Sequence, residues 1–85
     1  MKLGQVVATP GALAALEQSG EQPGEFLSRH ASGDWGRLCE EAHRENEFSM
    51  EHGFRLVSSH SLLNGTVIWV VTEADRTTLL LPQEY

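Results

Sequence analysis

Residues 54–73, FRLVSSHSLLNGTVIWVVTE, decide the fold of this chain. Two runs rich in β-branched and aromatic residues flank Asn64 and Gly65, a pair that is typical of a type I′ hairpin turn. A two-residue loop of this kind would place His60 opposite Trp69, with the two rings stacked across two antiparallel strands. The stretch therefore predicts a β-hairpin in the second half of the chain.

The residues after the hairpin predict one more strand. Residues 67–71, VIWVV, are apolar at successive positions, which is typical of a central strand covered on both faces. A turn at 73–76, EADR, leads to the run TTLLL at 77–81, and Pro82 ends that run because proline cannot donate to a strand ladder. The expected sheet is a three-stranded antiparallel meander, to which residues 3–8 could add a fourth strand.

Helices are expected before the meander. Pro10 and Pro23 each suit the first position of a helix, where the missing N–H costs nothing. A third helix is expected from about Trp35 to Met50, where apolar residues recur at helical spacing. The chain is thus predicted to be one α+β domain over residues 1–85, with two to three short helices followed by the meander.

The stretch HASGDWG, residues 30–36, connects the second and third predicted helices. Gly33 suits the positive φ of a helix C-terminus, and Asp34 suits the N-cap of the next helix. The segment is therefore interpreted as a tight helix–helix corner with a buried tryptophan. The alternative is a polar ligand site at this corner, formed by His30, Asp34, Trp35 and Asn46.

Asn46 falls on the apolar face of the third predicted helix. A buried amide must find hydrogen-bond partners, which His30 or the backbone of a neighbouring strand could supply. Another possible polar site comprises Glu73, Asp75 and Arg76. Its plainer interpretation is a solvated turn in which Asp75 bonds the backbone and Arg76 pairs with a carboxylate.

The outer face of the third predicted helix is acidic. The chain has twelve Asp and Glu against six Lys and Arg, a net charge of −6, which favours a basic partner surface and disfavours direct nucleic-acid binding. Phe48 projects from this face and either curls back to the core or serves as an exposed anchor. The residues expected to bind a partner are Glu40, Glu41, Glu47, Phe48 and Glu51.

Catalytic and metal chemistry find little support in the sequence. Cys39 and His43 are spaced as half a zinc site, but no second pair follows. Adjacent strand residues point to opposite faces, so Ser59 and His60 cannot act as a nucleophile–base pair. We expect no catalytic residue, no metal and no cofactor.

The single cysteine fits a reducing compartment, and the N-terminal residues make a poor signal peptide. No run reaches the length of a membrane span. We expect a cytoplasmic protein that does not bind membranes. Exposed strand edges allow a weak dimer, so the expected state is a monomer or weak dimer.

Four motifs together carry a resemblance: HASGDWG, GFRLVSSH, IWVVTEADR and LLLPQEY. Over most of residues 8–85 the chain resembles a family of small uncharacterised proteins carried by plasmids, phages and other mobile elements of bacteria. The resemblance implies a mobile-element context, and so a role in managing host defences or plasmid physiology. It brings no secure activity.

Three hypotheses follow. The first is a non-catalytic protein-binding module from a mobile element. It would bind the basic surface of a host defence or nucleic-acid-handling protein and modulate that protein. The second is a small ligand-binding or enzymatic domain that uses the HASGDWG cluster. The third is an accessory regulator that binds nucleic acid.

Overall fold

The computed structural model describes residues 3–38, 40–52 and 55–85, and only the backbone of residues 51 and 52. Cys39 and the side chain of Glu51, both named in the sequence hypotheses, lie outside the described residues. The expected α+β class is confirmed. The elements in chain order are β1 (Gln5–Ala8), α1 (Pro10–Ser19), α2 (Pro23–Ala31), α3 (Glu40–His52), β2 (Leu56–Ser61), β3 (Val67–Glu73), β4 (Arg76–Leu80) and the 3-10 turn η1 (Pro82–Glu84).

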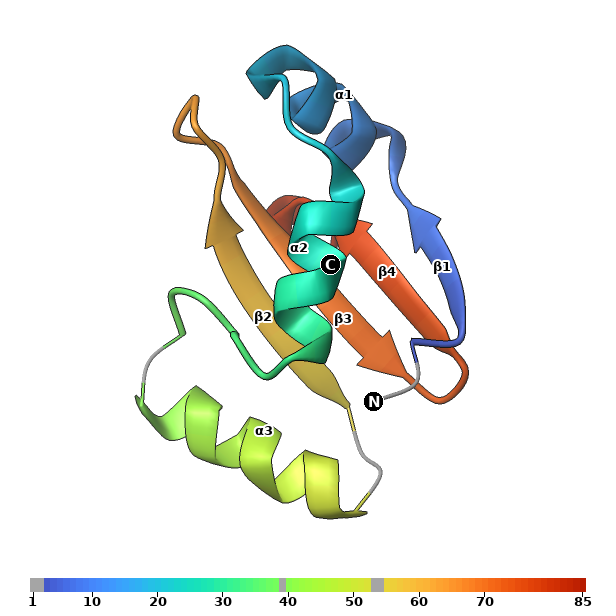
Figure 1. Ribbon diagram of the computed structural model, residues 1–85, viewed down its shortest axis with the longest axis vertical. Coiled ribbons are helices and arrows are strands. Elements are labelled where there is room, and N and C mark those ends of the chain that lie inside the picture. The colour runs from blue at the N-terminus through green and yellow to red at the C-terminus, as the bar shows by residue number, and fades with distance from the viewer. Residues whose placement is uncertain (1–2, 39, 53–54) are drawn as a thin grey trace.

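The sheet contains the expected meander and one further strand (Figure 1). Its strand order is β1-β4-β3-β2, in which β2, β3 and β4 pair antiparallel. The possible N-terminal strand is present as β1, but it runs parallel to β4, so the sheet is mixed rather than purely antiparallel. Gly4 permits this pairing, because a Cβ at that position would lie 2.0 Å from the carbonyl oxygen of Asp75.

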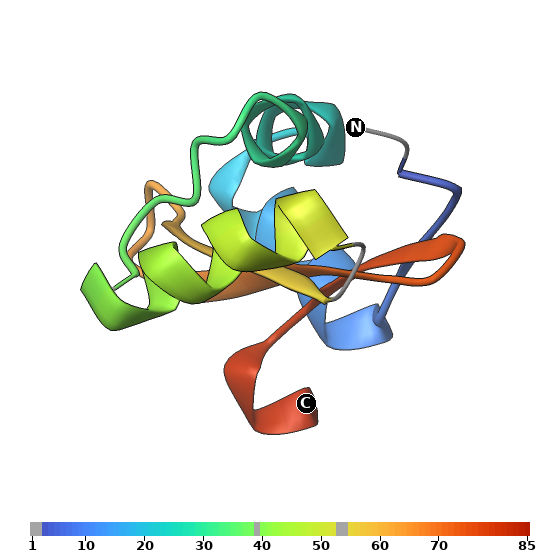
Figure 2. The ribbon, with the colours of Figure 1, turned by 90° about the horizontal axis from the view of Figure 1, so that it is seen from below.

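The two faces of the sheet are covered differently. Figures 1 and 2 show α2 across one face and the C-terminal turn on the other. Alternate strand residues point to opposite faces, so Ile68 and Val70 face α2 while Trp69 faces the C-terminal side. The main core lies on the α2 face and comprises Ala12, Ala15, Leu16, Phe26, Leu62, Ile68, Val70 and Leu79.

The hairpin between β2 and β3 exists, but its predicted register is wrong. The backbone N–H of Leu62 donates to the carbonyl of Thr66 at 2.7 Å, which makes a three-residue loop instead of a two-residue one. Gly65 takes the left-handed conformation, φ +88°, that closes loops of this length. His60 consequently pairs with Ile68.

This register decides what the two aromatic rings contact. His60 faces α2, where its ring centroid lies 5.5 Å from that of Phe26. Trp69 projects from the opposite face, with its ring centroid 5.6 Å from that of Tyr85. The expected stacking of His60 on Trp69 is therefore wrong.

The first two helices begin and end as their local signals predict. The hydroxyl of Thr9 accepts a hydrogen bond from the backbone N–H of Ala12 at 3.1 Å and caps α1. Gly20 ends α1 in the left-handed conformation. Gly33 follows α2 with φ +89°, as expected at that position.

The third helix starts later than predicted, because residues 35–37 pair with strand β2. The N–H of Ser59 donates to the carbonyl of Trp35 at 3.1 Å, and the N–H of Arg37 donates to the carbonyl of Ser59 at 2.7 Å. Gly36 thereby forms an isolated parallel bridge with Ser59. The tight helix–helix corner is wrong: an extended connection joins α2 to α3 and covers backbone groups at the edge of β2.

Asn46 attaches α3 to the same strand edge. Its side-chain Nδ2 donates to the carbonyl of Val57 at 2.5 Å, and its Oδ1 accepts from the N–H of Val57 at 3.1 Å. Of the two partners considered for this buried amide, His30 and a strand backbone, the structure has the strand backbone. Exposed strand edges invite pairing with other chains, and here the connection and Asn46 together block that pairing along β2.

Candidate functional site

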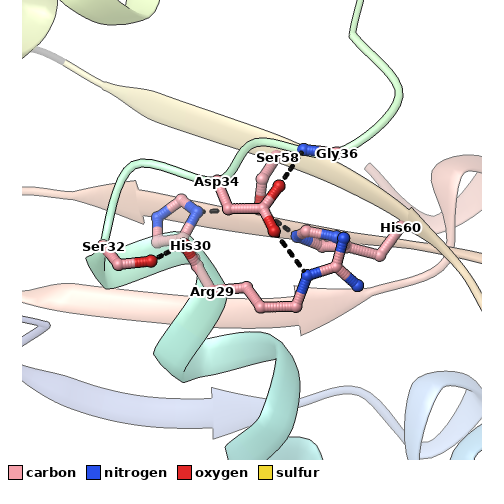
Figure 3. A network of polar contacts seen from close by, with 7 residues as sticks. All are labelled: Arg29, His30, Ser32, Asp34, Gly36, Ser58 and His60. Atoms are coloured by element: carbon pink, nitrogen blue, oxygen red, sulfur yellow. Dashed lines mark hydrogen bonds and ion pairs between the residues drawn. The ribbon is translucent and has the colours of Figure 1, made fainter.

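His30, the first residue of the HASGDWG stretch, lies in the middle of a buried hydrogen-bond chain. His30 is fully buried between α2 and the sheet. Its Nδ1 lies 2.8 Å from the hydroxyl of Ser58, and its Nε2 lies 2.9 Å from the hydroxyl of Thr72. The hydrogen-bond chain continues from the hydroxyl of Ser58 to His60 Nε2, 3.1 Å away. Figure 3 shows the two imidazoles on either side of the serine.

At its other end the chain reaches a backbone carbonyl, which fixes the direction of every hydrogen bond. The hydroxyl of Thr77 donates to the carbonyl of Leu3 at 2.6 Å, so it must accept from Thr72, 2.9 Å away. Thr72 then accepts from His30 Nε2–H. The carbonyl of Leu3 can only accept, and this sets the direction of each hydrogen bond back to His30. We therefore assign to His30 the tautomer that carries its proton on Nε2.

The same reasoning continues to His60. The unprotonated Nδ1 of neutral His30 accepts from the hydroxyl of Ser58, which in turn accepts from His60 Nε2–H. His60 Nδ1 is left as a buried acceptor without a hydrogen-bond partner among the described residues. With both rings neutral, each carries its proton on Nε2.

Burial supports the neutral state of both histidines. Desolvation, together with the nearby His60, lowers the pKa of His30 from 6.5 to about 4. Desolvation and the Arg29 guanidinium lower the pKa of His60, against an opposing effect of the Asp34 carboxylate. A proton added to His30 Nδ1 would have to break its hydrogen bond from the hydroxyl of Ser58.

Asp34 fixes the connection after α2 instead of capping α3. Its Oδ2 accepts from Arg29 Nε at 2.7 Å, and its Oδ1 accepts from the N–H of Gly36 at 3.1 Å (Figure 3). The hydrogen bond from Arg29 is the main cause, and that from Gly36 the next, of a lowered pKa of the Asp34 carboxyl. The expected N-cap role is wrong because the chain remains extended after Asp34.

The structure does not gather the predicted HASGDWG site. Hydroxyl groups take both ring nitrogens of His30, and the backbone of β2 takes the amide of Asn46. Trp35 is 5% exposed and packs against His43, with ring centroids 5.8 Å apart. Asp34 is in an exposed ion pair. The contacts of these four residues are thus with other parts of the fold and not with one another.

Sequence reasoning missed Ser58, Thr72 and Thr77 as members of the hydrogen-bond chain. A signal was present, because each lies at a strand position that faces α2 in the observed register. Polar residues at core-facing strand positions require partners. Without the correct hairpin register, those positions could not be assigned to a face.

The acidic residues of α3 lie on its exposed surface. Glu40, Glu41 and Glu47 are exposed, and Glu40 forms an i,i+4 ion pair with Arg44 at 2.8 Å. Of the two positions considered for Phe48, the structure has the exposed one, with 54% of the residue accessible. Met50 is 52% exposed, and its neighbour Ser49 is buried.

A cleft of about 760 Å³ lies between α3 and the sheet face opposite α2. Trp69 and Tyr85 line it together with the α3 side chains. The position of Tyr85 depends on Glu84, which accepts hydrogen bonds from the hydroxyl of Thr9 at 2.5 Å and from the N–H of Leu81 at 2.8 Å. These bonds, the one from Thr9 first, lower the pKa of the Glu84 carboxyl.

A second cleft, of about 560 Å³, brings together the three residues of the TEADR turn. Glu73, Asp75 and Arg76 all line it, next to Glu84 and Tyr85. Their side chains do not form the expected turn contacts. Arg76 forms no ion pair within the described part of the chain, and Glu73 pairs instead with Arg55 at 3.7 Å.

This chain was compared with known proteins. Searches of protein-family models, curated proteins and solved structures found no match for this chain. Across residues 3–38, 40–52 and 55–85, no helix is long and apolar enough to cross a membrane. In the same ranges, no group of three or more histidine, cysteine and acidic residues is placed to hold a metal ion.

Proposed function

We propose that this chain is a non-catalytic protein-binding module whose helix α3 docks on a basic surface of a partner protein. The observation that carries the proposal is the surface of α3, where Glu40, Glu41 and Glu47 are exposed next to the exposed Phe48. Carboxylates at the rim of an interface steer a basic partner, and an aromatic side chain gives it an anchor.

The attachment of α3 supports the same function. Asn46 holds the helix against the edge of β2, so the acidic surface points away from the domain on a rigid element. The net charge of −6 extends the attraction beyond direct contact at low salt. The partner is a host or element-encoded protein, in line with the resemblance to mobile-element proteins. The proposal includes a cytoplasmic location and a monomer or weak dimer.

The two alternatives receive less support. A ligand site at HASGDWG would need side chains with free hydrogen-bonding groups, and His30 and Asn46 have theirs engaged. A nucleic-acid regulator would need a basic face. Arg44 pairs with Glu40, and Arg37 donates to the hydroxyl of Ser61 at 3.0 Å.

Charge reversal on the outer side of α3 tests the proposal. We expect Glu40→Lys combined with Glu47→Lys to weaken partner binding by about tenfold or more at low salt, which corresponds to about 1.4 kcal/mol. The partner is first captured from a bacterial lysate at low and high salt, then purified and titrated by calorimetry.

A matched control separates the α3 surface from overall charge. Glu17→Lys combined with Glu25→Lys changes net charge equally, at exposed positions of α1 and α2. This control is expected to retain most of the affinity. Equal weakening by both pairs, or none by either, would contradict a docking surface on α3.

A further inference from the structure

The cleft between α3 and the C-terminal residues has an apolar centre. Trp69 and Val57 line it from the sheet, Tyr85 from the chain end, and Leu38 and Phe48 from the α3 side. Its volume of about 760 Å³ lies within the usual range of binding pockets. A chain segment with an apolar side chain could bury it there.

The two arginines that line this cleft are already engaged within the chain. Arg44 forms the ion pair with Glu40. Arg55 lies 5.3 Å from the ring centroid of Tyr85, in a cation–π contact, and pairs with Glu73. Their positive charge is therefore largely compensated by neighbouring groups.

Two glutamates, Glu41 and Glu45, also line the cleft. They lie four residues apart, on the same side of α3. Within the described residues neither forms an ion pair, since the ion pairs found there involve other residues. The cleft thus presents two carboxylates beside aromatic rings.

We propose that this cleft binds a peptide segment of the partner that carries a lysine or arginine next to an apolar residue. The apolar side chain packs over Trp69, and the cationic group lies near Glu41 and Glu45. Long basic side chains cover apolar surface with their methylenes while their charged ends reach carboxylates or aromatic faces. This inference rests on the proposed function and shares Glu41 and Phe48 with it, but the two can be tested apart, because neither Glu40 nor Glu47 lines the cleft.

Selection from a library of short random peptides displayed on phage, followed by NMR, tests the proposal. We expect the selected peptides to carry lysine or arginine beside an apolar residue. The chain has two tryptophans, so the indole N–H signals give an internal control. The selected peptide is expected to shift the signal of Trp69, which lines the cleft, and to leave that of the buried Trp35 unmoved.

Two charge-reversed pairs on one helix then assign the binding surface. Glu41→Lys with Glu45→Lys is expected to lower the affinity for the selected peptide by about tenfold or more. Glu40→Lys with Glu47→Lys makes the same change in net charge outside the cleft and is expected to weaken it much less. Circular dichroism checks that both pairs remain folded, and Glu41→Gln with Glu45→Gln should give a smaller effect in the same direction.

Four results would overturn the cleft proposal. One is selection of acidic or uncharged peptides, and another is binding that leaves the Trp69 signal in place. A third is equal weakening by the two charge-reversed pairs. The last is a Trp69 signal that moves with protein concentration alone, because that would make a second copy of the chain the occupant. If binding of the captured partner is weakened by Glu40→Lys with Glu47→Lys but not by Glu41→Lys with Glu45→Lys, the proposed function stands and the cleft proposal fails.

Discussion

Replacing Gly36 by alanine is expected to destabilise the domain by about 4 kcal/mol, from left-handed strain together with overpacking. The glycine has φ +67°, and a Cβ there would lie 2.0 Å from the carbonyl oxygen of Ser59 and 2.8 Å from His60 Nδ1. The backbone contact cannot relax without breaking the bridge that joins residues 35–37 to β2. Small domains have only about 5–15 kcal/mol of stability, so a large part of the total would be lost. Urea denaturation followed by circular dichroism measures this loss.

Gly33→Ala provides the matched control. Gly33 also has a positive φ, +89°, but a Cβ there would meet nothing within 4 Å. We expect this variant to lose only about 1 kcal/mol, from backbone strain alone. If the two alanine variants lose equal stability, the close approach of Gly36 to β2 is not a determinant of the fold. The difference between the two variants therefore measures the cost of the contact with Ser59 separately from the cost of the left-handed backbone conformation.

Local signals in the sequence were sufficient where neighbouring residues decide the structure. Thr9 and Gly20 bound α1 because a cap and a left-handed stop act within one turn of the helix. The hairpin follows from β-prone runs on both sides of Asn64 and Gly65. That the amide of Asn46 would need a partner was predictable, because a buried polar residue on an apolar helix face must be hydrogen-bonded. The sequence left the choice between His30 and a strand backbone open, and the structure has the strand.

Contacts between distant residues decided the rest. The residues from Trp35 to Leu38 have helical spacing, yet they are not helical, because Trp35 and Arg37 pair with Ser59 instead. The hairpin loop differs from the predicted one by a single residue, which changes the partner of every residue in β2. In the observed register Ser58 and His60 face α2, where His30 and Phe26 contact them. No local signal distinguishes the two loops.

The acidic surface of α3 was predictable in part. The spacing of Glu40 and Glu47 places them on the outer side of the helix, where the structure has them exposed. The cleft was not predictable, because it depends on where the register places Trp69 and on how Glu84 positions Tyr85. Glu41 and Glu45 differ from Glu40 and Glu47 in lining this cleft.

Stability is expected to fall as the pH drops from about 6.5 to about 4, because His30 is buried as a neutral ring. Its pKa is lowered from 6.5 to about 4, so in this window the unfolded chain binds more protons than the folded one. The stabilisation from the neutral ring is fully present above pH 6.5 and is lost as the pH approaches 4. The shift corresponds to about 3 kcal/mol for His30, and the lowered pKa of His60 acts in the same direction. Urea denaturation at a series of pH values measures the change.

A glutamine at position 30 distinguishes the histidine from other titrating groups. In His30→Gln the amide N–H can donate to Thr72 and the amide oxygen can accept from Ser58, as the two ring nitrogens do now. The variant is expected to be less stable at neutral pH but to lose much less stability on acidification. His43→Gln, which leaves the hydrogen-bond chain intact, should retain the full pH dependence. An unchanged pH dependence in His30→Gln would show that the neutral imidazole is not the acid-sensitive group, and would remove the reason for assigning one proton direction to the whole chain from Leu3 to His60.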